Sequence, residues 1–282
     1  MKKILEQGFF TGERALFHSS MLDIRDSVFC DGESPLKESF DIEISGSIFK
    51  WKYPLWYCKN IGVKDTVLLE TARSGIWYTH NVSMERCVIE APKTFRRSSD
   101  ISLSECNMPN AQESFWNCSG ISLKKVTAAG DYFAMGCDGV FADGLIIDGN
   151  YAFDGAKNIE IKNSKLISKD AFWNSENVTV RSSVIIGEYL GWNSKNLTFI
   201  DCYIESNQGL CYIENLKIEN TKLINTDLAF EFSSVDAEIT SEIDSVKNPI
   251  GGKIKAKAIR ELIMEETMID PSKTVIETEK KD

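Results

Sequence analysis

The sequence of 282 residues contains little histidine and little proline, and it has no long apolar run. Its only histidines are His18 and His80 and it has no Cys-x-x-Cys pair, so the ligand spacing of a zinc site is missing and we expect no bound metal. Neither a nucleophile elbow nor a phosphate-binding glycine loop is present, and we expect no cofactor. Glu6 and Gln7 interrupt the N-terminal apolar stretch, and no segment has the length of a membrane span, which predicts a cytoplasmic protein.

Positive charge is also scarce. The chain has 32 Lys and Arg against 42 Asp and Glu, which gives a net charge of −10. A surface of this sign has no general attraction to nucleic acid or to an anionic membrane, so we expect neither as a partner. The chain has eight cysteines, but most of them occupy repeat positions that Ser, Thr or Ala fill elsewhere, which indicates reduced thiols in a core.

The most informative feature of the sequence is a repeat of about 19 to 20 residues. An aliphatic anchor marks each repeat, and successive anchors are 19 to 21 residues apart. The anchors are Leu22, Ile42, Ile61, Val82, Ile101, Ile121, Val140, Ile159, Val178, Leu197, Leu216 and Val235. Independent helices would carry loops of different lengths, so a period this constant indicates stacked coils. The signature of leucine-rich repeats, which can have a similar period, is absent.

Alternation within each repeat predicts strands. A second apolar residue stands two positions after most anchors. A small residue stands five positions after the anchor, and another apolar residue stands seven positions after the anchor. Asn, Asp or Gly precedes most anchors, and these residues tolerate the left-handed backbone of a tight corner. We therefore predict an all-β chain that forms a right-handed, single-stranded parallel β-helix of about 11–12 coils, with three short strands per coil.

The regularity of the repeat also divides the chain. Residues 1–235 are predicted to form the β-helix, and residues 1–14 are predicted to cap the open end of its core. The pattern loosens after Val235, so residues 236–282 are predicted to form degenerate coils or a C-terminal cap that ends in a charged tail.

Five of the six tryptophans share one position of the repeat, five residues before the anchor. They are Trp56, Trp77, Trp116, Trp173 and Trp192. Arg96 and Asp154 occupy the same position in other coils, and burying either without a partner would cost several kcal/mol. This favours an outward row with the preceding Leu and Phe residues inward, and the alternative is an aromatic stack inside the core.

An outward aromatic row would suit sugar rings, and charged residues flank it. The cations Arg73, Lys93, Arg96 and Arg97 are candidates for binding a carboxylate of the substrate. The alternative is that they form salt bridges to Glu70, Glu90 and Glu113. Two carboxylate pairs on neighbouring coils, Glu113 with Asp131 and Asp170 with Glu188, are expected to fall at roughly the separation of glycosidase acids and bases and are the candidate catalytic residues.

Nearly the whole chain resembles an uncharacterised bacterial family that consists of a domain of unknown function. The segments that carry the resemblance are GERALF, GESPLKES, FKWKYPLWY, ETARSGIWYT, APKTFRRS, KDAFWNSENVTV and GEYLGWNSKNLTF. The resemblance implies a pectate-lyase-like β-helix, and it brings no catalytic residues.

Carbohydrate chemistry follows from the resemblance only by analogy of fold. We therefore expect binding or processing of a small carbohydrate or uronate, by chemistry similar to that of a polysaccharide lyase or a glycoside hydrolase if the protein is an enzyme. The alternative is a non-catalytic scaffold or protein-interaction module. The sequence leaves the oligomeric state open.

Overall fold

The computed structural model describes residues 1–279, so the last three residues of the predicted charged tail lie outside the described part. The chain divides into two compact units, Met1–Ile147 and Asp148–Asp282, which we call unit 1 and unit 2. Both are built of parallel strands, and the only helices in the described residues are the 3-10 turns η1 (Glu70–Ala72) and η2 (Pro271–Lys273). No helix in this part of the chain has the length and apolar character needed to span a membrane.

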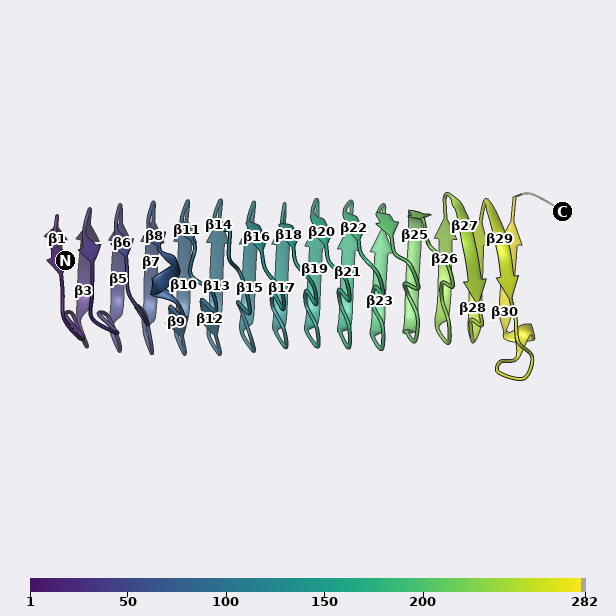
Figure 1. Ribbon diagram of the computed structural model, residues 1–282, viewed down its shortest axis with the longest axis horizontal. Helices are drawn as coiled ribbons and strands as arrows, with labels where there is room; N and C mark the ends of the chain where they lie inside the picture. Colours follow the sequence, from purple (N-terminus) through teal and green to yellow (C-terminus); the bar gives the residue numbers. More distant parts are fainter. Residues whose placement is uncertain (280–282) are drawn as a thin grey trace. The chain divides into compact units, whose positions relative to one another are not determined.

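In unit 1 each coil contributes one long strand, and each long strand pairs in parallel with that of the next coil (Figure 1). The long strands are β1 (Lys3–Glu6), β3 (Ser20–Arg25), β5 (Phe40–Ser45), β7 (Lys59–Lys64), β10 (His80–Glu85), β13 (Ser99–Ser104), β15 (Ser119–Lys124) and β17 (Asp138–Asp143). A second ladder consists of β2 (Phe9–Phe10), β4 (Val28–Phe29), β6 (Ile48–Phe49), β8 (Val67–Leu68), β11 (Val88–Ile89), β14 (Asn107–Met108) and β16 (Thr127–Ala129). The next short strand, β18 (Ile146–Asp148), contains the boundary between the units.

Unit 2 repeats this plan, and its last coils have a different second ladder. Its long strands are β19 (Lys157–Lys162), β21 (Glu176–Arg181), β23 (Lys195–Ile200), β25 (Glu214–Ile224), β26 (Ser234–Ile239), β28 (Gly251–Ala256) and β30 (Thr274–Thr278). The short strands are β20 (Lys165–Ile167), β22 (Val184–Ile186) and β24 (Tyr203–Glu205). In the last coils a second parallel pair, β27 (Glu242–Lys247) and β29 (Ala258–Ile263), replaces the short strands.

The structure confirms the all-β class and the parallel β-helix, and it has more coils than predicted. Eight long strands in unit 1 and seven in unit 2 make fifteen coils in the described residues. The three extra coils hold Lys3, Gly252 and Thr274 at the anchor position, since Lys3 pairs with Leu22, Gly252 with Val235 and Thr274 with Gly252. None of the three is aliphatic, so the anchor pattern did not reveal these coils.

The third side of each coil also differs from the prediction. It forms a strand only at β9 (Ile76–Trp77) and β12 (Phe95–Arg96), which pair with each other, and it is a turn in most other coils. Phe115, Phe153 and Phe172 hold the left-handed φ values of 66°, 63° and 58° in these turns. A bulky residue avoids this region unless packing compensates, and all three rings are fully buried.

The core is filled by the rows of apolar side chains that the repeat predicts. The anchors from Leu22 to Val235 are buried, and stacked phenylalanines such as Phe29 and Phe49 lie with ring centroids 4.4 Å apart. Seven of the eight cysteines are buried free thiols, in keeping with their prediction as small core residues.

The corner asparagines form hydrogen-bonded ladders. In unit 1, Asn60 donates to Asp41 over 2.7 Å and Asn81 donates to Asn60 over 2.9 Å. In unit 2 the ladder runs through Asn158, Asn177, Asn196 and Asn215. The residue before the anchor therefore has two roles. It adopts the left-handed backbone of the corner, and its side-chain amide forms a hydrogen bond between neighbouring coils.

Candidate functional site

The tryptophan row lies on the outer side of the coils. Trp56, Trp77 and Trp116 are half-buried, whereas the residue before each of them, Leu55, Ile76 or Phe115, is fully buried. The same holds for Trp173 and Trp192 in unit 2. The favoured outward orientation is therefore confirmed, and the aromatic core stack is excluded.

The faces of these rings are covered, however. Trp56 and Trp77 stack on each other with centroids 5.2 Å apart and an interplanar angle of 8°. The guanidinium of Arg96 lies between the next two rings, 4.7 Å from the centroid of Trp77 and 4.6 Å from that of Trp116. Both faces of Trp77 and one face each of Trp56 and Trp116 are therefore in contact with a neighbour, so unit 1 does not carry the expected continuous strip of open indole faces.

The indole N–H groups are occupied as well. Trp56 donates to the carbonyl oxygen of Ser74 over 2.6 Å, Trp77 to that of Lys93 over 2.8 Å and Trp116 to that of Tyr132 over 2.9 Å. Each acceptor lies in the following coil. The tryptophans of unit 1 thus connect neighbouring coils, which is a structural role that their position in the sequence did not reveal.

Glu113, a candidate catalytic residue, is held by two of the candidate cations. Its Oε2 lies 3.0 Å from Lys93 Nζ and 3.4 Å from an Arg96 nitrogen. The alternative of salt bridges thus applies to these two cations. The main-chain N–H of Glu113 donates to the carbonyl of Asp131 over 2.9 Å, so these two residues lie on neighbouring coils as predicted.

Arg73 and Arg97 differ from the other two cations. Both side chains are exposed, and neither has an ion pair within residues 1–279. Arg97 shares its repeat position with Tyr57 and Tyr78, whose rings stack with centroids 4.8 Å apart. We call the outer surface formed by these residues the cationic strip. It consists of Trp56, Tyr57, Arg73, Trp77, Tyr78, Lys93, Arg96, Arg97 and Trp116.

In unit 2 the second carboxylate pair lies in two different environments. Asp170 is buried, and burial raises its pKa above the ordinary value, against the opposing effects of Lys169 and of a hydrogen bond from Tyr151. Glu188 is exposed and pairs with Lys169 at 3.4 Å. The main-chain N–H of Asp170 donates to the Glu188 carbonyl over 2.9 Å. The pair therefore shares one edge of the coils, but only Glu188 faces the solvent.

The two tryptophans of unit 2 also differ from each other. Trp192 donates to the carbonyl of Gln208 over 2.6 Å, as the indoles of unit 1 do. Trp173 stacks on Tyr151 at 6.3 Å, and its indole nitrogen is buried without an acceptor. The five tryptophans therefore do not form one uniform binding surface, and those that the structure brings together with arginines lie in unit 1.

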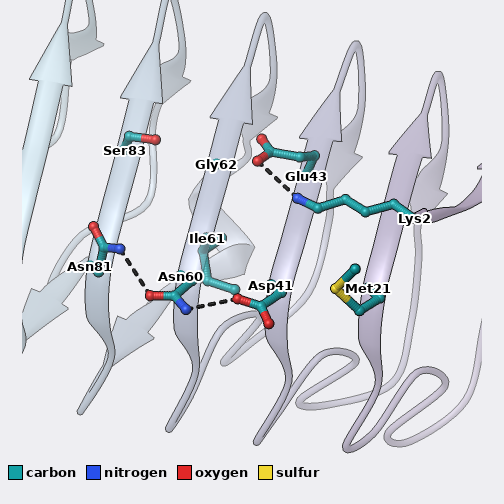
Figure 2. Close-up of a pocket in the computed structure, with 9 residues that line it drawn as sticks. All are labelled: Lys2, Met21, Asp41, Glu43, Asn60, Ile61, Gly62, Asn81 and Ser83. Carbon is teal, nitrogen blue, oxygen red and sulfur yellow. Dashed lines mark hydrogen bonds and ion pairs between the residues drawn. The ribbon is translucent and has the colours of Figure 1, made fainter.

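A recess that the sequence did not reveal lies on the outer face of the first long strands (Figure 2). It has a volume of about 490 Å³ and crosses β5, β7 and β10. Gly62 has no side chain where neighbouring coils carry Glu43 and Ser83, and the Glu43 carboxylate lies over Gly62 and pairs with Lys2 at 3.0 Å. Gly62, a glycine inside a predicted strand, is the sequence feature that could have indicated this recess. Within residues 1–279 no group of acidic, histidine or cysteine side chains is arranged to hold a metal ion.

The chain matches one protein family and is similar to several solved structures. The family described as "Protein of unknown function (DUF3737)" matches residues 3–277, and no curated protein matches. The solved structures that are similar include PfbA, a surface adhesin of Streptococcus pneumoniae, at 12% identity over 79% of this chain and 82% of that chain, with a TM-score of 0.49. They also include the A-module of the mannuronan C-5 epimerase AlgE4 of Azotobacter vinelandii, at 10% identity over 97% of this chain and 87% of that chain, with a TM-score of 0.33. Likenesses this distant say nothing about what the chain binds.

Proposed function

The chain belongs to the DUF3737 family of unknown function, and we propose from the molecule itself that the cationic strip binds an acidic glycan, a chain of uronate sugars. The observation that carries the proposal is the pair of exposed arginines, Arg73 and Arg97, which lack acidic partners in residues 1–279 although the chain as a whole carries a charge of −10. A guanidinium binds a carboxylate through two parallel hydrogen bonds, which makes it the side chain best suited to a uronate.

The aromatic rings support the same ligand in a way that differs from stacking. The edge of an aromatic ring carries partial positive charge, and Trp77, whose faces are covered by Trp56 and Arg96, has only its edge left for a ligand. Edges of this kind attract the oxygen atoms of hydroxyl and carboxylate groups. The strip is therefore suited to the polar rim of a sugar. The apolar face of a sugar would need an aromatic ring with an uncovered face.

The period of the fold gives the strip a repeat. Neighbouring coils of a parallel β-fold lie about 4.8 Å apart, and one sugar ring lengthens an extended polymer by a similar distance. A uronate chain that lies across the coils would thus bring successive carboxylates to successive coils. Arg73 and Arg97 are on successive coils but at different repeat positions, nine residues before Val82 and four before Ile101, so a chain that contacts both would cross the coils obliquely.

We propose a binding surface and not an active site. Glu113, the candidate acid that pairs with cations of the strip, is already engaged by Lys93 and Arg96. Its role in the proposal is to hold those two cations in place beneath the ligand. Asp170 and Glu188 belong to unit 2 and are no part of the strip.

Isothermal titration calorimetry with oligogalacturonate tests the proposal, with a neutral oligosaccharide of equal length as the control ligand. The double variant Arg73→Ala/Arg97→Ala should lose at least tenfold in affinity for the uronate, which corresponds to about 1.4 kcal/mol. Arg181→Ala, which removes an exposed arginine of unit 2, should bind as the natural protein does. No binding of either sugar, or equal binding by the natural protein and the double variant, would refute the proposal and favour the scaffold role.

A further inference from the structure

The first coil breaks the rule that every other coil of unit 1 obeys. In the parallel register of β1 and β3, Lys3 is the partner of Leu22 and so occupies the inward anchor position. The later anchors of unit 1 are buried aliphatic residues, whereas Lys3 is exposed. Its neighbour Lys2 lies on the outer face and pairs with Glu43 (Figure 2).

The rest of this coil end is apolar and incompletely covered. Leu5 is the register partner of Ile24, and Phe10 stacks on Phe29 with centroids 4.8 Å apart. Both Leu5 and Phe10 are half-buried, whereas Ile24 and Phe29 in the next coil are at most 2% exposed. Residues 3–10 therefore form a coil of the solenoid, and the side of that coil turned away from β3 exposes part of the core.

Such an end can accept another coil. Among the described residues β1 pairs with β3 alone, so the N–H and C=O groups along its other edge are free for a further strand, and apolar side chains lie beside them. A second copy of this chain presents the same edge and the same apolar side chains. Two identical ends related by a two-fold axis would cover each other and close the assembly at two chains.

We propose that Lys3 is the residue that prevents this end-to-end pairing with a second copy. In a paired end its ammonium group would lie at the anchor position between two coils, where it would lose its water without gaining an acid. An inward-pointing charge on a short edge strand is a device by which proteins protect exposed edges. The exposed end of the first coil could thus pair with the same end of a second copy, and the charge of Lys3 prevents this pairing.

Replacing Lys3 tests the proposal. Lys3→Ile restores the aliphatic anchor and should form a dimer, seen as a doubling of the mass measured by light scattering after gel filtration. The natural chain should stay monomeric under the same conditions. Lys2→Ile makes the same change of charge and size on the outer face of the same segment, so this control should also stay monomeric.

A second variant locates the contact. Lys3→Ile/Leu5→Lys returns a charge to the next inward position, and it should be monomeric again with an unchanged circular dichroism spectrum. A monomeric Lys3→Ile variant would overturn the proposal. So would a natural chain that already dimerises, a Lys2→Ile variant that dimerises equally, or a dimer that persists when Leu5→Lys is added.

Discussion

The left-handed turns of the third side lead to a prediction about two neighbouring phenylalanines. Phe95 and Phe115 stack at 4.5 Å, and both are fully buried in the same row of successive coils. Phe115 has a φ of 66°, whereas Phe95 lies in β12 with an ordinary strand backbone. Removing either ring should cost about 3–5 kcal/mol. The two sites should nevertheless respond differently to the choice between alanine and glycine.

The difference follows from the backbone. At an ordinary position glycine destabilises by about 0.5–1 kcal/mol relative to alanine because it loses more freedom on folding. A left-handed residue with a Cβ is strained by roughly 1–2 kcal/mol, and glycine is free of that strain. Phe95→Gly should therefore be less stable than Phe95→Ala. Phe115→Gly should be as stable as Phe115→Ala or more stable, which puts the two glycine–alanine differences about 1–2 kcal/mol apart.

Urea unfolding followed by tryptophan fluorescence measures all four variants against the natural chain. Comparing glycine with alanine at each site removes the large shared effect of losing the ring, so errors in the absolute free energies of unfolding matter little. The reasoning would be refuted by the same glycine–alanine difference at both sites. That result would mean that the turn at Phe115 relaxes in solution and stores no strain.

Three further predictions concern the ladder, the buried carboxyl and the thiols. Asn177→Ala should lower the free energy of unfolding by about 1 kcal/mol, because it removes the exposed hydrogen bonds that link Asn177 to Asn158 and Asn196, and urea unfolding checks this. Asp170→Asn should raise the melting temperature at neutral pH, since the raised pKa of Asp170 means that this carboxyl favours folding in acid and loses that contribution as the pH rises through its folded-state pKa. This increase in melting temperature should become smaller when melting is measured at a pH below the ordinary pKa of aspartate, and an increase independent of pH would contradict this account. Burial raises the pKa of Cys58 to about 12, so a thiol reagent at neutral pH should label half-buried Cys30 in the native protein and reach Cys58 only after unfolding, which peptide mass spectrometry can follow.

The sequence predicts the coils wherever the anchor is aliphatic. Elsewhere it leaves coils or a cap open for residues 236–282 and predicts a cap for residues 1–14. The stack from Leu22 to Val235 follows from periodicity alone, because each coil repeats the same inward positions. The coils of Lys3, Gly252 and Thr274 depend instead on hydrogen bonds between main chains, which leave no pattern in the side chains. The turns at Phe115 and Phe172 escape prediction for the opposite reason, since their large apolar side chains indicate a strand while packing imposes a left-handed backbone.

The charged site shows a related limit. The repeat correctly brings Lys93, Arg96 and Glu113 to neighbouring positions and turns the tryptophans outward. It does not show that Arg96 lies between Trp77 and Trp116, because the spacing gives the row of a side chain and not its rotamer. That detail changes the chemistry, since a ring whose face is already covered offers a sugar only its edge.

In a solenoid of this kind, residues that depart from the repeat are the best candidates for function. Residues that satisfy the repeat, such as the corner asparagines and the stacked tryptophans, are explained by the contacts they make with the next coil. Arg73, Arg97 and Lys3 make no such contact in the described residues, and each is a charge at a place where the local structure gains nothing from it. The lack of an ion pair is not enough by itself, since exposed Arg181 also has none in the described residues. Arg73 and Arg97 differ from Arg181 in belonging to a strip that holds further cations and aromatic rings, and Lys3 differs in standing at an inward anchor position. This is why the two arginines are assigned to a ligand and the lysine to the exclusion of a second chain.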